Sequence, residues 1–152
     1  MKKEIIIFKP GKAVSAILFL LLFFAINSFA QIGQDRQLAD QYMNNAEYEK
    51  AAQLYDKLMD KDPFGTYPQY YRCLIAMKDY NEVEKLAKKM FKKQETNLTY
   101  LVDLGYVYMQ MGQPDKAKVQ YDKAIKSMKP DQGQVITLAS AFLNKLETDY
   151  AL

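Results

Sequence analysis

Histidine is absent from the 152-residue sequence, and cysteine occurs once, at Cys73. Without histidine the commonest general base is missing, and Ser-His pairs, Cys-His pairs and histidine metal sites are all excluded. The sequence also contains no GxSxG motif, no P-loop and no GxGxxG motif. We therefore expect a protein that is not an enzyme and that holds neither a metal ion nor a cofactor.

A single cysteine has no partner for a disulfide within the chain. We interpret Cys73 as a small buried hydrophobic residue on a helix. The alternative is a disulfide between Cys73 and a second chain, which an oxidising compartment allows.

Residues 1–30 have the pattern of a secretory signal peptide. A lysine-rich start is followed by a run at 13–26 that is apolar except for Ser15, and small residues stand at Ser28 and Ala30. This run is shorter than the roughly 20 apolar residues that a bilayer span needs. The leader therefore predicts export rather than a membrane-spanning helix.

We predict cleavage between Ala30 and Gln31, which leaves residues 31–152 as one periplasmic or secreted domain of a Gram-negative bacterium. The alternative is an uncleaved signal anchor at 13–30 that holds the chain in the inner membrane.

The positive charge of the chain belongs to the leader. The whole sequence has 21 Lys+Arg and 18 Asp+Glu, a net charge of +3. The leader contains four lysines and one glutamate, which account for this excess, so the remaining residues are balanced. We therefore expect no nucleic-acid partner.

After the leader, apolar residues recur at three- and four-residue intervals, which is a helical period, and strand-like alternation is absent. Asn81 and Asn97 are expected to cap helices, and Pro114 suits a first helical turn. Pro63 and Pro130 are expected to end the helices before them. The pattern predicts an all-α fold of helical hairpins joined by short turns.

Small and aromatic residues recur at fixed spacing along these helices. Around Ala51, an aromatic residue lies nine positions earlier, at Tyr42, and another lies four positions later, at Tyr55. The same spacing relates Tyr108, Ala117 and Tyr121, and then Phe142 and Ala151, with small residues Ala39, Gly105 and Ala139 three positions before each first aromatic. This pattern resembles the tetratricopeptide repeat, a pair of antiparallel helices of about 34 residues.

The resemblance implies a right-handed α-solenoid of stacked antiparallel helical hairpins. The repeats are expected at about 32–63, 64–97 and 98–131, with a partial fourth repeat at 132–152. Repeat arrays close with a polar capping element, but this end carries Val135, Leu138, Phe142, Leu143 and Leu146. We expect these apolar residues to lack a cover, so this end either continues into further repeats or docks on a partner.

First helices of this family line a concave groove, which implies a protein or peptide partner there. The groove positions that the resemblance implies here are Arg36, Asp40, Met43, Asn44, Arg72, Ile75, Val102, Tyr106, Met109, Gln110, Ile136, Ser140, Leu143 and Asn144. Some members grip a peptide carboxylate through Lys and Asn, but this chain has Arg36 and Asp40 at the front positions and no cation at Thr99 or Asp103.

Within this set, Val102, Tyr106 and Met109 share one stripe of a helix, and an apolar stripe facing solvent suggests a contact site. The alternative is that Tyr106 packs against the second repeat.

Five lysines share one face of another helix, because they are spaced at three- and four-residue intervals. They are Lys85, Lys88, Lys89, Lys92 and Lys93. One interpretation is a solvated outer face, and the alternative is peripheral contact with an anionic membrane or glycan.

The sequence therefore predicts an exported, non-enzymatic interaction module or scaffold that binds a partner segment in its groove. The alternative function is an envelope-surface protein that uses the lysine face.

Cleavage of the leader is directly testable. N-terminal sequencing of the exported protein is expected to begin at Gln31. Recovery of intact Met1 in the membrane fraction would support the anchor instead.

Overall fold

The computed structural model describes residue 17 and residues 31–129 and 131–150, with side chains described up to residue 145. The predicted signal segment, apart from residue 17, lies outside the described residues, and so does Pro130, the predicted helix stop. The predicted cleavage point lies just before Gln31, where the continuous described part begins. No helix within the described part of the chain is long and apolar enough to span a membrane.

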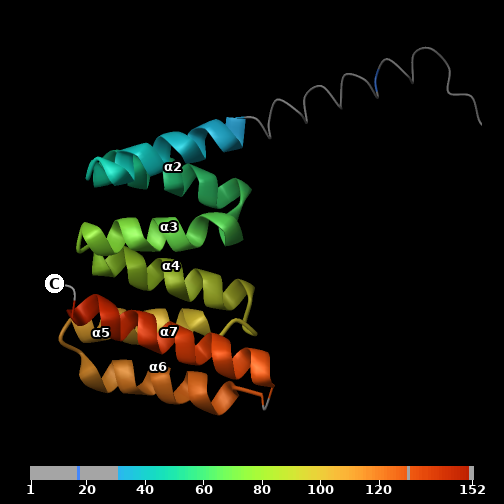
Figure 1. The fold of residues 1–152 in the computed structure, drawn as a ribbon, viewed down its shortest axis with the longest axis vertical. Helices are drawn as coiled ribbons and strands as arrows, with labels where there is room; N and C mark the ends of the chain where they lie inside the picture. The colour runs from blue at the N-terminus through green and yellow to red at the C-terminus, as the bar shows by residue number, and fades with distance from the viewer. Residues whose placement is uncertain (1–16, 18–30, 130, 151–152) are drawn as a thin grey trace, which may run out of the picture.

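Regular structure in the described residues is helical throughout. A helix at 31–44 is followed by α2 (Tyr48–Lys61), α3 (Pro63–Ala76), α4 (Tyr80–Lys93), α5 (Thr99–Gln110), α6 (Pro114–Ser127) and α7 (Gln132–Tyr150). The helices up to α6 stack one above another, and short turns join them (Figure 1). This arrangement confirms the predicted all-α solenoid of helical hairpins.

The three hairpins turn by the same backbone geometry. Ala46, Lys78 and Gly112 each follow a first helix and have φ of 58°, 57° and 68°. In each turn the next amide nitrogen donates to a carbonyl five residues earlier, at 2.8, 3.0 and 2.8 Å respectively. This is the Schellman closure of a helix, and all three hairpins use it.

Helix starts agree with the sequence in part. Pro63 and Pro114 occupy first turns, of α3 and α6, and α2 ends at Lys61, before Pro63. The expectation that Asn81 caps α4 is wrong, because the Asp79 carboxylate accepts from an amide there and Asn81 already lies inside the helix.

Asn97 acts just outside the next helix. Its Oδ1 accepts hydrogen bonds from the backbone nitrogen of Thr99 at 3.2 Å and from the Thr99 hydroxyl at 2.7 Å. The side chain therefore satisfies an amide at the start of α5, as a cap does.

Small residues allow the paired helices to approach each other closely. Ala39, Ala51 and Ala117 have no exposed surface. A Cβ added at Gly105 would lie 2.1 Å from the Tyr121 ring, so the missing side chain of α5 makes room for an aromatic of α6. Ala139 of α7 is exposed, because among the described residues no second helix covers that face.

The last helix, α7, departs from the regular stack. Whereas α3 packs on α2 and α5 on α4, α7 has its close backbone contacts with α5. It lies beside α5 rather than beyond α6 (Figure 1). As a result, α7 stands on one side of the stack instead of extending it.

This placement corrects part of the expectation for the fourth repeat. Leu138 is only 4% exposed, and the Phe142 ring meets the Tyr121 ring edge-on at a centroid distance of 5.3 Å. Val135 and Leu143 remain exposed, as expected. The side chain of Leu146 lies outside the described residues.

Gly105→Ala tests the close approach of α5 and α6. Alanine raises helix propensity by about 1 kcal/mol, but its methyl group must displace the packed Tyr121 ring, and overpacking costs about 1–3 kcal/mol. We expect a net loss of stability in thermal or urea unfolding. The control is Gly33→Ala, where a Cβ meets nothing within 4 Å, and it should be neutral or stabilising. Equal effects at both positions would contradict the packing.

Candidate binding groove

A groove of about 680 Å³ runs between α3, α5 and α7. We call it the α3–α7 groove. Its α3 side carries Tyr67, Tyr71 and Arg72, its α5 side Thr99, Tyr100 and Asp103, and its α7 side Ile136, Thr137, Ser140, Asn144 and Lys145.

A second cavity of about 560 Å³ adjoins the groove. It reaches from Met43 and Ile75 to Tyr106 and Gln110. Tyr71, Arg72, Asn144 and Lys145 line both spaces, so the two meet at these side chains.

Aromatic rings form the floor of the groove. The Tyr67 ring lies edge-on to Tyr100 at a centroid distance of 4.8 Å and is 5.8 Å from Tyr71. All three side chains are less than 8% exposed. Rings packed against one another in this way give the groove a rigid floor, of which only small parts of each ring are exposed.

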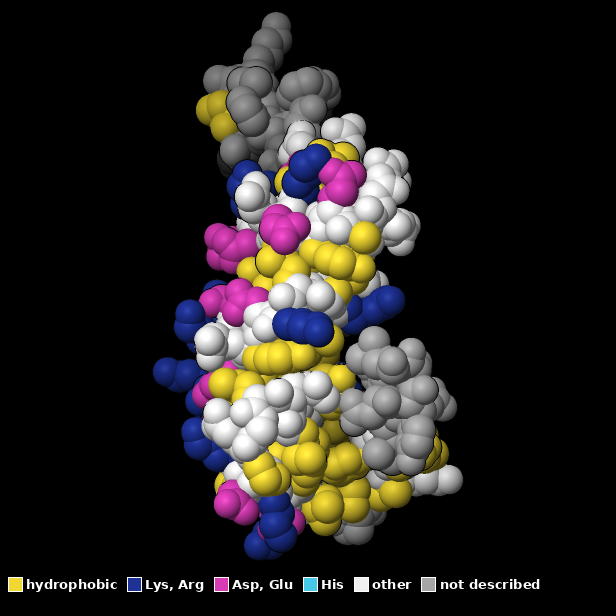
Figure 2. Space-filling model, turned by 90° about the vertical axis from the view of Figure 1, so that its left-hand side faces the viewer, with side chains coloured by type: hydrophobic (Ala, Val, Ile, Leu, Met, Phe, Trp, Pro, Cys, Tyr) yellow, Lys and Arg dark blue, Asp and Glu magenta, His cyan; other side chains and the backbone are white. Residues whose placement is uncertain are grey.

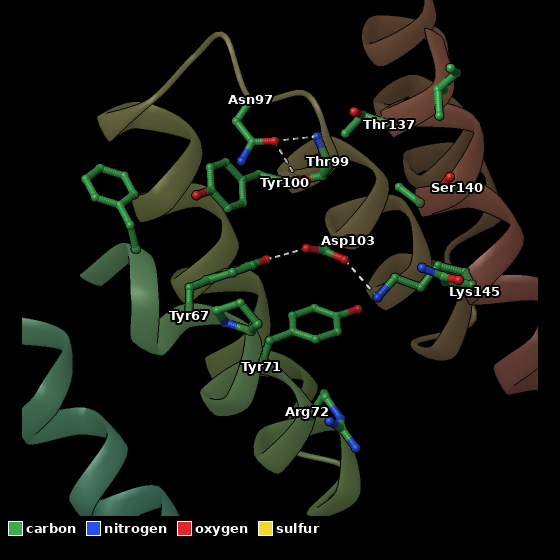
Figure 3. Close-up of a pocket in the computed structure, with 15 residues that line it drawn as sticks. Tyr67, Tyr71, Arg72, Asn97, Thr99, Tyr100, Asp103, Thr137, Ser140 and Lys145 are labelled. Carbon is green, nitrogen blue, oxygen red and sulfur yellow. Dashed lines mark hydrogen bonds and ion pairs between the residues drawn. The ribbon is translucent and has the colours of Figure 1, made fainter. Parts of the chain in front are cut away.

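A carboxylate is buried at the edge of this floor. Asp103 is 9% exposed, and its two oxygens have different partners. The Tyr67 hydroxyl donates to Oδ2 at 2.6 Å, and the Lys145 ammonium donates to Oδ1 at 2.8 Å. Figure 3 shows Tyr67 of α3, Asp103 of α5 and Lys145 of α7 converging here. This network ties three helices together.

Burial and the neighbouring carboxylate control the Tyr67 hydroxyl. Loss of solvent, and then the charge of Asp103 and its hydrogen bond, hold the pKa of Tyr67 well above its ordinary value. Burial also raises the pKa of Tyr71, with Asp103 as the next cause. Both hydroxyls therefore remain neutral hydrogen-bonding groups at physiological pH.

The Lys145 ammonium also lies over two aromatic rings. Its nitrogen is 4.1 Å from the centroid of Tyr71 and 5.2 Å from that of Tyr106. Ring faces attract cations within about 6 Å. The Tyr71 hydroxyl is buried and has no hydrogen-bond partner among the described residues.

The structure gathers many of the predicted groove residues around these two spaces. Arg72 and Asn144 line both. Ile136 and Ser140 line the groove, and Met43, Ile75, Tyr106 and Gln110 line the second cavity.

The remaining predicted positions lie elsewhere. Arg36 donates to Asp62 Oδ2 at 2.8 Å and to the Gly65 carbonyl at 2.9 Å, so it ties the helix at 31–44 to the start of α3. Asp40 accepts from the Tyr55 hydroxyl at 2.6 Å. Asn44, Met109 and Leu143 are exposed but line neither space.

The predicted exposed stripe on α5 does not exist. Val102 has no exposed surface and Tyr106 is 3% exposed, whereas Met109 is 49% exposed. The prediction that Val102 faces the groove is wrong, because α4, α6 and α7 all pack on α5 and bury each residue from Tyr100 to Tyr108. Tyr106 is a packed wall of the second cavity, under Lys145.

Sequence reasoning missed Tyr67, Tyr100, Asp103 and Lys145 as groove residues. One signal was present, because Asp103 is the only charged residue of α5, in the segment "TYLVDLGYVYMQ". A charge inside an otherwise apolar helix predicts a buried, partnered carboxylate.

The lysine face lies on the outside of α4. All five lysines are exposed. Lys85 pairs with Glu82, and Lys88 pairs with Glu84, each on the same helix. Basic side chains also gather along one edge of the stack (Figure 2). Carboxylates on α4 therefore offset part of the positive charge that the sequence suggested.

Cys73 is buried, in agreement with its expected packing role. Burial raises the pKa of its thiol to about 11, which disfavours the reactive thiolate. Among the described residues, no cluster of three or more acidic or cysteine side chains is suited to a metal ion.

Comparisons with known proteins agree with this architecture. No family model matches the chain. It is 38% identical over 61 residues to Tetratricopeptide repeat protein 37 of Xenopus laevis, a match covering 40% of this chain and 4% of that protein. The crystal structure of yeast Tom70 superimposes with a TM-score of 0.56 and 16% identity, over 80% of this chain and 25% of that one. The chain is thus similar to tetratricopeptide repeat proteins and has their fold, while spanning a small part of these two.

Tyr67→Phe tests the buried network. Asp103 loses one donor, which should cost about 1–3 kcal/mol of stability at neutral pH. A raised tyrosine pKa contributes stability that is present below pH about 10 and is lost as pH rises through the folded-state value. The variant should therefore lose stability less steeply than wild type above pH about 10, in unfolding followed by circular dichroism. An unchanged alkaline slope would contradict the assignment.

Proposed function

We propose that this chain is an exported protein-interaction module that holds a segment of a partner protein in the α3–α7 groove and performs no catalysis. The observation that carries the proposal is the groove itself, whose floor holds the buried rings of Tyr67, Tyr71 and Tyr100 and where the Tyr71 hydroxyl has no hydrogen-bond partner among the described residues. An apolar floor with few polar groups is the usual composition of a binding site.

The fold supports this proposal at a coarser level, because stacked helical repeats create extended concave binding surfaces. Export is the expectation from residues 1–30, and it sets the compartment in which a partner is to be sought. The partner that fits best is a protein segment with an apolar or aromatic side chain for the tyrosine floor.

A second candidate function uses the lysine face. Lys89, Lys92 and Lys93 are exposed on α4, and a basic helix face attracts anionic lipid or glycan by roughly 1 kcal/mol per side chain near the surface. The carboxylates paired with Lys85 and Lys88 weaken this attraction.

Matched surface changes separate the two functions. Ile136 lines the groove and is 57% exposed, whereas Val119 lies on α6, outside the groove, and is 60% exposed. Ile136→Lys should abolish retention of partners captured from an envelope extract, because it places a charge in the apolar groove. Val119→Lys should leave retention unchanged, and both variants should keep the wild-type unfolding temperature.

Salt dependence tests the alternative in the same assay. Contact through the lysine face should weaken steeply as salt rises, because salt screens exposed charges. Contact through the groove should weaken little. If Ile136→Lys retains every partner, and retention falls with salt, the groove function is wrong and the lysine face is favoured.

A further inference from the structure

The surroundings of the Lys145 nitrogen have the composition of a receptor for an ammonium group. Asp103 supplies a carboxylate oxygen at 2.8 Å, and Tyr71 and Tyr106 place ring centroids at 4.1 and 5.2 Å. We call Asp103, Tyr71 and Tyr106 the ammonium site. A buried carboxylate with two ring faces attracts cations by charge and by the ring quadrupoles.

The site and its present occupant belong to different parts of the fold. Tyr71 lies on α3, and Asp103 and Tyr106 lie on α5, inside the hairpin stack. Lys145 comes from α7, which stands on the side of that stack (Figure 1). The ammonium site is thus formed by helices of the hairpin stack, whereas the cation that occupies it belongs to α7.

The packed contacts of α7 hold its middle, ahead of Lys145 in the sequence. Close backbone contacts of α7 are with α5, and buried Leu138 and packed Phe142 anchor its middle. Ile136 and Leu143 are more than half exposed. Withdrawal of the Lys145 side chain therefore uncovers the site while these two anchors stay in place.

The site is reachable by a bound chain. Tyr71 and Lys145 line both the α3–α7 groove and the second cavity, so the ammonium site lies where the two spaces meet. Tyr71 at this junction is 6% exposed, and its hydroxyl has no hydrogen-bond partner within the part of the chain that the structure describes. Buried polar groups normally have a hydrogen-bond partner, so this hydroxyl can bond to a polar group that enters the junction.

The charge selects the class of ligand. Without Lys145 the three residues of the ammonium site carry the single negative charge of Asp103, which attracts an alkylammonium group, whereas Arg72 at the same junction opposes this attraction. An ammonium on a flexible apolar stem has the chemistry of the Lys145 side chain, whose nitrogen now lies over the Tyr71 and Tyr106 rings.

We propose that the ammonium site receives a lysine side chain of the partner segment, which displaces Lys145 from Asp103. The inference rests on the proposed groove function for the position of the partner. In the free protein Lys145 is an internal competitor, and it lowers the apparent affinity for the partner's lysine by occupying the site. Removal of Lys145 should therefore strengthen binding of an alkylammonium group.

Lys145→Ala with n-butylammonium as the probe tests the site alone. The probe replaces the deleted stem and charge, so it should raise the unfolding temperature of Lys145→Ala in a saturable manner and affect wild type little. The neutral isostere n-butanol should not do so, and Asp103→Asn combined with Lys145→Ala should abolish the effect. The matched control is Lys116→Ala, which removes an exposed lysine that also lies over a tyrosine ring, at 5.6 Å.

Each outcome decides the proposal. No stabilisation of Lys145→Ala, or equal stabilisation by n-butanol or of Lys116→Ala, overturns it and leaves Lys145 as a structural ion pair. If Lys145→Ala is unfolded by itself, recovery of helical circular dichroism on adding n-butylammonium supports the site, and no recovery overturns it.

The result is independent of the groove function. Saturable n-butylammonium binding together with full partner retention by Ile136→Lys would establish that the site binds an ammonium group, but it would refute the groove function and with it the displacement of Lys145 by a partner's lysine. Loss of retention by Ile136→Lys without n-butylammonium binding would keep the groove function and refute the ammonium site.

Discussion

The close approach of α5 to its neighbours is the constraint on which the rest of this structure depends. Gly105 has no side chain where the Tyr121 ring lies, so α6 comes near enough for that ring to pack on the α5 backbone. On its other sides α5 is covered by α4 and α7. As a result, every residue from Tyr100 to Tyr108 is buried. A polar side chain within this buried stretch needs a partner inside the protein, since it has little access to water.

Asp103 is the group that this requirement bears on most. Its carboxylate lies in a buried stretch of α5. It accepts a hydrogen bond from the Tyr67 hydroxyl of α3 and forms an ion pair with the Lys145 ammonium of α7. A buried carboxylate that loses its cation costs about 3–5 kcal/mol. The position of α7 on the side of the stack therefore brings Lys145 to the buried Asp103 carboxylate of α5, the helix on which α7 packs.

The hairpins could be predicted from sequence because their signals are local. Small residues such as Ala51 and aromatic residues such as Tyr55 recur at a spacing that fixes which faces pack within one hairpin, and this spacing also predicts the buried Ala117. The turns follow for the same reason, since Lys78 and Gly112 occupy equivalent positions and adopt the same backbone conformation.

The groove could be predicted only in part, because its geometry depends on contacts between distant segments. Helical periodicity assigned Val102 to an exposed stripe, and it could not show that α4, α6 and α7 together enclose α5. The family resemblance predicts that Arg36 and Asp40 line the groove. In the structure Arg36 donates to Asp62 and Asp40 accepts from Tyr55, so both are used in packing between helices. The fold was thus encoded in spacing, whereas the groove was encoded in pairings such as Asp103 with Lys145.

Under the proposed function, these pairings also determine how a partner enters the groove. A segment that only pushes α7 aside leaves Asp103 without a cation and meets the cost of an unpaired buried charge. A segment that brings its own ammonium exchanges one cation for another, so the number of ion pairs at Asp103 is unchanged and the released Lys145 regains its rotamer freedom. The buried carboxylate therefore discriminates among partner segments by charge, and the tyrosine floor supplies contact area without adding to that discrimination.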